Sequence, residues 1–351
     1  MMVDLASYKL GEGRVTTMRH TTFYHEAGPA DGPTIVFVHG WPEIGLAWAH
    51  QMHALATLGY HVVAPDLRGF GRSALYSSHA AYAQRELVAD LIELMDALGI
   101  ARALWVGHDW GAATVWNVVR HHPARCVAVA ALCIPYATLD RGLDALAALV
   151  NREQYPIATY PVGQFDYIAF YHEQFELARA TFDADVTRSI KVLLRASDPA
   201  LAGVVYPTAF VRKNGGWFGG RPVPDVPLDR AILSENDLAA YTRAYERSGF
   251  FGPDSLYMNE RDNVRYADEA ASQTIDVPVL FLSGLFDFVC DTERSSLMEP
   301  MRAACSRLSV ETIASGHWMM HERAPETSDA LVQFARSLGR NPDAGGVSFS
   351  P

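Results

Sequence analysis

The sequence predicts an α/β fold in which a mostly parallel β-sheet is flanked by helices and interrupted by a helical insertion. In the first third of the chain, short apolar runs rich in β-branched residues alternate with segments of helical periodicity. Residues 135–264 contain few strand-like runs and many aromatic residues, and the strand–helix alternation returns after Gln273. Strands and helices that alternate at this pitch indicate right-handed βαβ crossovers, and therefore parallel strands.

The elements of the first third follow from these patterns. Continuous apolar runs are typical of strands buried on both faces, and they occur at 34–39, 61–65, 103–108 and 126–133. Apolar residues at helical spacing over 82–98 and 112–122 predict two helices, which would connect parallel strands. Residues 14–20 and 22–26 predict an antiparallel edge.

The rest of the chain divides into an insertion and a second α/β part. The insertion has helical stretches at 167–180 and 235–247. After it, we expect strands at 279–283 and 308–313 and helices near 292–304 and at 325–338. The predicted division is a core over 1–134, a helical cap over 135–264, the second part of the core over 265–340 and a flexible tail over 341–351. Such a cap would cover the carboxyl ends of the strands, where open α/β sheets bind ligands.

The composition indicates a globular protein with a large core. The 351 residues are 49% hydrophobic and 20% charged, which excludes a disordered chain. The net charge of −11 argues against binding nucleic acid through its phosphates. The sequence has no run of 18 apolar residues and no signal-peptide pattern, so we expect no membrane anchor and a cytoplasmic location. The four cysteines have no CxxC spacing, which predicts neither a metal site nor a disulfide framework.

The densest motif is Gly107-His108-Asp109-Trp110-Gly111, between a predicted strand and a predicted helix. This arrangement, with a nucleophile between two glycines, forms a sharp turn that projects the central side chain above the sheet. Serine is the usual occupant, whereas the carboxylate of Asp109 can attack an sp³ carbon and form an alkyl ester that water then cleaves. The N-terminus of the following helix favours its negative charge. The alternative is that Asp109 only caps that helix.

A base and an acid follow in the order that this turn requires, which is nucleophile, acid and histidine. His317, in the SGHW motif at 315–318, is the candidate base, although any one of 13 histidines is more often structural. A neutral imidazole can take a proton from water near pH 7, and a carboxylate on its other nitrogen fixes the tautomer. We assign that carboxylate to Asp287, after the preceding strand, and interpret Asp291 in the same loop as a helix N-cap.

The turn His39-Gly40-Trp41-Pro42 ends the first buried strand. A glycine here lets a backbone N–H point at the same place as the amide that follows the nucleophile. We therefore expect the Trp41 and Trp110 amides to form an oxyanion hole during ester hydrolysis. The Trp41–Pro42 bond is a candidate cis peptide, and His39 is expected to make structural hydrogen bonds under the loop.

Together these motifs resemble the α/β-hydrolase-fold epoxide hydrolases, over about residues 14–338. The matching stretches are HGWP at 39–42, DLRGFGRS at 66–73, GHDWG at 107–111, GLFD at 284–287 and SGHW at 315–318. The resemblance implies an α/β-hydrolase fold whose cap supplies two tyrosines that hold and protonate the epoxide oxygen. The motifs around Tyr167 and Tyr257 are similar to the family's two tyrosine motifs, so these residues receive that role; Tyr171 lies one helical turn away, and most of the 15 tyrosines should serve packing.

The chain also departs from the family pattern in two places. Trp41 stands where members often carry phenylalanine, which should matter little if the backbone amide does the work. The glycine- and proline-rich loop at 213–227 has no clear counterpart and could alter substrate access.

The resemblance implies a mechanism that needs no cofactor and no metal. A small apolar epoxide binds between core and cap, Asp109 attacks a ring carbon, and His317, oriented by Asp287, activates the water that releases a vicinal diol. Two alternatives stay open: a haloalkane or haloacid dehalogenase, in which the Trp110 indole could hold the halide, and a ligand-binding homologue without activity. Detoxification, biosynthesis and signalling are all compatible roles, and a homodimer paired through the cap is compatible with the sequence.

Overall fold

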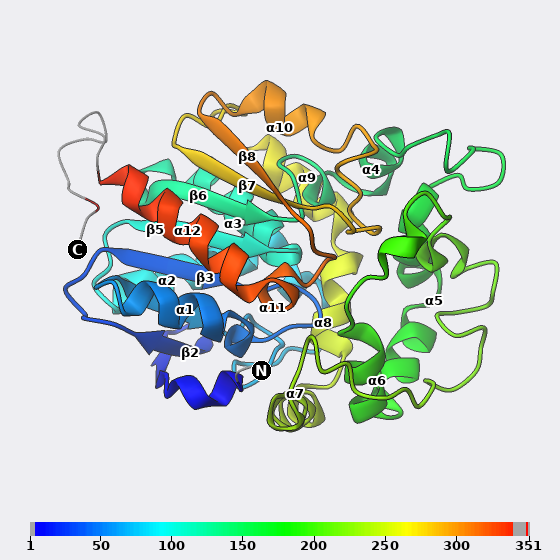
Figure 1. Cartoon of the computed structure of the whole chain (residues 1–351), viewed down its shortest axis with the longest axis horizontal. Coiled ribbons are helices and arrows are strands. Elements are labelled where there is room, and N and C mark those ends of the chain that lie inside the picture. Colours follow the sequence, from blue (N-terminus) through cyan, green and yellow to red (C-terminus); the bar gives the residue numbers. More distant parts are fainter. Residues whose placement is uncertain (1–3, 340–348, 350–351) are drawn as a thin grey trace.

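A computed structural model describes residues 4–339 and residue 349. Its centre is an eight-stranded sheet with the strand order β1-β2-β4-β3-β5-β6-β7-β8 (Figure 1). The strands are β1 (Gly11–Thr16), β2 (Thr21–Ala27), β3 (Thr34–Val38), β4 (His61–Pro65), β5 (Ala103–His108), β6 (Cys126–Leu132), β7 (Val279–Gly284) and β8 (Leu308–Ile313). β2 pairs antiparallel with β1 and β4, and β3 to β8 are parallel, so the predicted sheet and its antiparallel edge are confirmed. The tail predicted at 341–351 lies outside the described residues, apart from residue 349.

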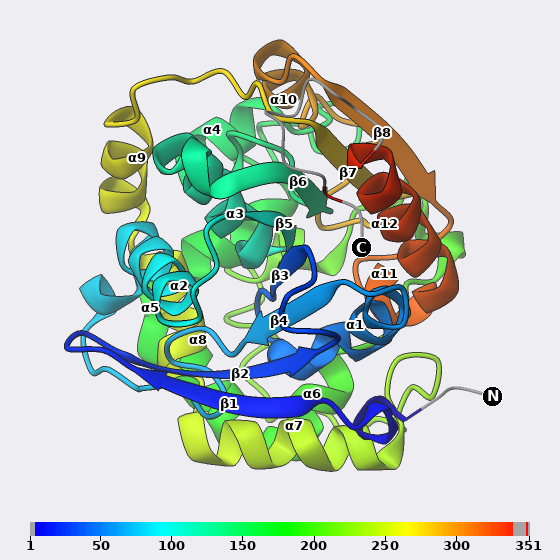
Figure 2. The ribbon, with the colours of Figure 1, turned by 90° about the vertical axis from the view of Figure 1, so that its left-hand side faces the viewer.

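Helices pack on both faces of the sheet. Figure 2 shows α2 (Gln84–Ala97) and α3 (Trp110–His121) on one side, and α1 (Ala49–Ala56), α11 (Met319–Glu322) and α12 (Ala324–Leu338) on the other. Strand β3 is buried along its whole length and is apolar after Thr34, because its side chains pack on both faces of the sheet. Ile35 and Phe37 belong to the hydrophobic cluster of α1 and α12, whereas Val36 and Val38 belong to the cluster of α2 and α3. This two-sided core anchors the loops at the ends of the strands.

The segment between β6 and β7 is built from helices, which lie largely beyond one end of the sheet (Figure 1). They are α4 (Leu143–Ala148), α5 (Asp166–Asp183), α6 (Val186–Leu193), α7 (Glu235–Ser248), α8 (Phe251–Ser255) and α9 (Glu260–Asp268). The helices predicted at 167–180 and 235–247 are α5 and α7, and α7 begins with a capping box between Ser234 and Asp237. The predicted boundary between the cap and the second part of the core, at 264 and 265, falls inside α9.

Among the described residues, every helix is too short or too polar to cross a membrane.

The helix predicted near 292–304 is shorter than expected. Only α10 (Glu299–Ala304) forms, and the residues before it make turns. Asp291, predicted to cap that helix, accepts a hydrogen bond from the Arg294 backbone N–H at 3.2 Å and so caps a turn. The reason is tertiary: the Ser296 backbone N–H donates to the carbonyl of Leu149 at 3.0 Å, which takes it out of a helical ladder.

Candidate active site

Asp109 stands on the sharp turn between β5 and α3. Its φ of 52° and ψ of −127° lie in a region that residues other than glycine rarely adopt. Gly111 is required beside it, because a Cβ there would lie 2.1 Å from the carbonyl oxygen of Val38. The Asp109 side chain does not cap α3; its Oδ1 accepts a hydrogen bond from the Trp41 backbone N–H at 2.8 Å. The structure therefore argues against a mere capping role.

The turn after β3 meets the nucleophile turn directly. A Cβ on Gly40 would lie 2.5 Å from Asp109 Oδ1, so only glycine allows this approach. The Trp41–Pro42 peptide is cis, as predicted. His39 makes the expected structural bonds: its Nδ1 donates to the carbonyl of Gly40 at 2.9 Å, and its Nε2 accepts from the Leu67 N–H at 3.0 Å.

The Trp110 amide directly follows Asp109 in the chain. Trp110 is the first residue of α3, where backbone N–H groups lack an acceptor within the helix. The Trp41 amide donates to the Asp109 carboxyl group, and the Trp110 amide stays a predicted second donor of the oxyanion hole. The Trp110 side chain lines a separate small cavity, on which Tyr257 also borders.

His317 and Asp287 come together from the loops after β8 and β7. The Nδ1–H of His317 donates to Asp287 Oδ2 at 2.7 Å, and Nε2 lies 3.7 Å from Asp109 Oδ2. The other oxygen of Asp287 accepts the backbone N–H groups of Cys290 at 2.9 Å and Val289 at 3.2 Å. The structure thus brings together the three side chains that the sequence motifs predicted.

Burial and neighbouring charges shift the pKa values of His317 and Asp287 in opposite directions. Burial lowers the pKa of His317, but the Asp287 and Asp109 carboxylates outweigh it and hold that pKa well above its ordinary value. Burial raises the pKa of Asp287, but His317 and the Cys290 backbone N–H outweigh it and leave that pKa below its ordinary value. The pair is therefore ionised in the free protein at neutral pH.

Tyr167 and Tyr257 lie opposite this group, on the helical segment. Tyr167 is in the first turn of α5, and Tyr257 lies in a 3-10 helix (Leu256–Met258) after α8. Their ring centroids are 5.6 Å apart, with an angle of 82° between the planes. Burial is the main reason that the pKa of each phenol is raised well above its usual value. Both remain protonated and able to donate a hydrogen bond.

One cavity of about 370 Å³ joins these residues. The predicted residues whose atoms line it are Trp41, Asp109, Tyr167, Tyr257, Asp287 and His317. Apolar side chains of the helical segment supply much of the remaining wall: Val192, Leu193, Leu201, Val211, Trp217 and Phe218. Tyr206 and Trp318 also line it. Trp318 belongs to the SGHW motif, and Trp217 and Phe218 lie in the glycine- and proline-rich loop noted in the sequence. No motif singled out the other residues, because their contact with the cavity depends on how the helices pack.

His317 also belongs to two groups with metal-ligating atoms within 4.8 Å of one another. One group adds His108 and Cys133, and the other adds Asp287 and Cys290. Burial raises the pKa of both thiols well above the usual range, and both side chains lie beside His317. These residues are better explained as the packing around the ionised pair.

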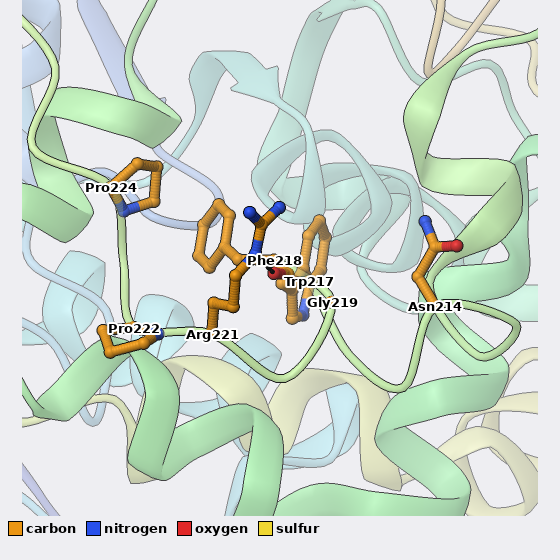
Figure 3. A pocket seen from close by; sticks show the side chains of 7 residues that line it. All are labelled: Asn214, Trp217, Phe218, Gly219, Arg221, Pro222 and Pro224. Carbon is orange, nitrogen blue, oxygen red and sulfur yellow. Dashed lines mark hydrogen bonds between the residues drawn. The ribbon is translucent and has the colours of Figure 1, made fainter.

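A second, outer hollow of about 730 Å³ adjoins the cavity at the predicted access loop (Figure 3). Trp217 and Phe218 line both spaces. Figure 3 shows their rings beside Arg221, whose Nε–H donates to the carbonyl of Phe218 at 3.2 Å. The residues lining the hollow, all in the described part of the chain, include no nucleophile–base pair, so the smaller inner cavity is the candidate site.

The chain is similar in sequence and in fold to known proteins. The alpha/beta hydrolase fold family matches residues 33–324. Epoxide hydrolase A of Mycobacterium tuberculosis is 33% identical over 316 residues, which cover 89% of this chain and 93% of that protein. Bifunctional epoxide hydrolase 2 of Sus scrofa is 29% identical over 91% of this chain, and the chain spans 54% of that protein. The crystal structure of epoxide hydrolase A from Mycobacterium thermoresistibile has a TM-score of 0.74 and 32% identity, and the match covers 93% of this chain and 98% of that one. The chain belongs to the epoxide hydrolases of the α/β-hydrolase fold.

Proposed function

We propose that this protein hydrolyses epoxides to vicinal diols through an ester on Asp109. The observation that carries the proposal is that a single cavity is lined by Asp109, by His317 with Asp287, and by the phenols of Tyr167 and Tyr257. A nucleophile, a base and two acids are the groups that this reaction needs.

Ring opening is the first step. Asp109 Oδ2, the oxygen that the Trp41 amide leaves free, attacks a ring carbon and forms a C–O ester bond. The bond between that carbon and the epoxide oxygen breaks, and its electron pair goes to the oxygen. A proton from Tyr167 or Tyr257 neutralises the developing alkoxide, which would otherwise be a poor leaving group. The product is a hydroxyalkyl ester.

Ester hydrolysis is the second step, and the first step prepares it. The ester no longer carries the negative charge that helped to raise the pKa of His317, so that pKa falls. The imidazolium loses its proton through water to the tyrosinate that ring opening left, which restores the phenol and leaves a neutral imidazole that can act as a base. His317 takes a proton from water, and the hydroxide attacks the ester carbonyl. Oδ1 becomes the oxyanion, held by the Trp41 N–H and by that of Trp110. The bond between Cγ of Asp109 and the ester oxygen then breaks, and the departing oxygen takes a proton from the new carboxylic acid. The diol leaves, Asp109 is a carboxylate again, and His317 keeps the proton that it took from water.

The surroundings support a small apolar epoxide and water as the reactants. We propose that residues 135–264 act as the cap that supplies both phenols and the apolar wall of the cavity. A cytoplasmic location and pairing of two copies through the cap are further proposals, which cell fractionation and analytical ultracentrifugation would test.

Product analysis distinguishes this proposal from the dehalogenase alternative. An epoxide oxygen needs an acid, and two phenols line the cavity, whereas a halide needs N–H donors and the Trp41 indole N–H is already donated to Asp254. The purified protein is incubated with a panel of epoxides and of haloalkanes. We expect diols from epoxides; halide release with no diol formation would reject the proposal, and binding without turnover would favour the ligand-binding alternative.

A further inference from the structure

Asp254 is a buried acid that this mechanism does not use. It lies in α8, three residues before Tyr257, and 0% of it is exposed. Its Oδ1 accepts two hydrogen bonds, from the Trp41 indole Nε1–H at 2.8 Å and from the Tyr171 hydroxyl at 3.1 Å. Within the described part of the chain, its Oδ2 has no hydrogen-bond partner. A carboxylate is costly to bury without a paired cation, and burial raises the pKa of Asp254 well above its usual range. The side chain is therefore a neutral carboxyl group.

The two donors connect Asp254 to opposite sides of the active site. Trp41 belongs to the core, and its backbone N–H also donates to Asp109. Tyr171 belongs to α5, and its ring stacks on that of Tyr257, with centroids 4.7 Å apart and planes at 2°. The Trp41 ring meets the Tyr257 ring edge-on, at 6.1 Å and 77°. One carboxyl group thus holds two of the rings that pack against Tyr257.

We propose that Asp254 is a positioning residue for ring opening, which fixes Trp41 and Tyr171 and through them aims the Tyr257 phenol at the bound epoxide oxygen. The proposal rests on the proposed function and adds a chemical requirement to it: the position needs a neutral hydrogen-bond acceptor. The proposal also gives the indole N–H of Trp41 a function, because a phenylalanine at that position would leave the Asp254 carboxyl group with only the Tyr171 hydroxyl as a hydrogen-bond donor.

The test measures ester formation and ester hydrolysis separately, in single turnovers with styrene oxide as the probe. Acid quenching followed by intact-protein mass spectrometry gives the amount of ester at each time. Asp254→Leu leaves two buried donors without an acceptor, and we expect ester formation to slow by about tenfold. Asp254→Asn keeps a neutral carbonyl acceptor and should remain within about threefold of the wild type. Ester hydrolysis, in which Tyr257 takes no part, should change less than ester formation.

Two further variants separate positioning from a general loss of stability. Tyr171→Phe keeps the stacked ring but removes one donor; it should slow ester formation by about threefold, and it remains informative if Asp254→Leu fails to fold. The matched control is Asp237→Leu, because Asp237 is also buried but caps α7. It should lower the melting temperature and leave the ratio of the two rates unaltered.

The outcomes decide between the explanations. A selective loss of ester formation in Asp254→Leu, with rescue in Asp254→Asn, supports the positioning role. An equal loss of both rates, or a loss in Asp254→Asn as large as in Asp254→Leu, overturns it. If the wild type forms neither ester nor diol from epoxides, the proposed function fails and the positioning role fails with it.

Discussion

The imidazole Nε2 of His317 lies 3.7 Å from the Oδ2 of Asp109, which is longer than a hydrogen bond. The Asp109 carboxylate is therefore close enough to raise the pKa of His317 without a direct bond between the two groups. In the proposed mechanism the Asp287 and Asp109 carboxylates together keep His317 protonated, and formation of the ester removes the charge of Asp109, which lowers the pKa of His317 and lets it act as a base.

Replacing His317 with glutamine should trap the intermediate. Without a base, we expect ester hydrolysis to slow by about 10² to 10⁴-fold, while ester formation continues because it depends on Asp109 and the phenols. Intact-protein mass spectrometry after incubation with an epoxide should show a mass increase equal to that of the epoxide. The double variant Asp109→Asn/His317→Gln is the control and should show none. Continued turnover of His317→Gln at the wild-type rate would contradict the role of His317.

The two phenols should contribute to ring opening and to nothing later. Tyr167→Phe and Tyr257→Phe should each lower the rate of ester formation by about 10 to 100-fold, and the double variant should lower it further. Stopped-flow or quenched single turnovers measure this rate, and the hydrolysis of preformed ester serves as the internal control. A double variant that opens epoxides at the wild-type rate would show that the acid lies elsewhere.

The stability of the free protein should depend on pH through His317 and Asp287. The pKa of His317 is raised above 6.5, so its contribution is complete below that pH and is lost as the pH rises through the raised pKa. The pKa of Asp287 is lowered below 3.8, so its contribution is present above that pH and is lost as the pH falls through the lowered pKa. The stability difference between the wild type and His317→Gln should thus be largest between these limits and shrink at alkaline pH. Urea unfolding at several pH values measures it, and a constant difference up to strongly alkaline pH would contradict the pairing.

Trp217 should limit the size of the substrate. Its ring lies within the wall shared by the inner cavity and the outer hollow, and it stacks on Trp41 with centroids 6.2 Å apart. Trp217→Ala should join the two spaces and raise kcat/KM for long or bulky epoxides relative to small ones. Asn214→Ala, on the same loop but lining only the hollow, is the matched control. An unchanged preference in Trp217→Ala would show that substrates do not pass this wall.

Much of the core could be predicted from the sequence because its signals are local. Residues 61–65, 103–108 and 308–313 form strands with the predicted bounds, since each is a short run of strand-forming residues ended by a turn. The order of the motifs predicts the catalytic positions Asp109, Asp287 and His317. Each follows a parallel strand, and because the carboxyl ends of parallel strands lie at the same end of the sheet, the three side chains come close together.

Other features depend on contacts between distant segments and have no local signal. The turns at 292–298 replace a predicted helix because Ser296 bonds to Leu149, far away in the sequence. Asp254 has helical neighbours and no motif, and its partners Trp41 and Tyr171 lie in different parts of the chain. The wall formed by Trp217 likewise depends on where a glycine-rich loop folds back, which residue types alone do not specify.

The most direct test of the central claim follows one oxygen atom. In ¹⁸O-labelled water, with enzyme in excess over an epoxide, each active site turns over once. If Asp109 forms the ester and water attacks its carbonyl, the label enters the Asp109 carboxylate and the first diol is unlabelled; peptide mass spectrometry and analysis of the diol read out both. A labelled diol together with an unlabelled Asp109 would mean that water attacks the epoxide directly and would contradict the mechanism.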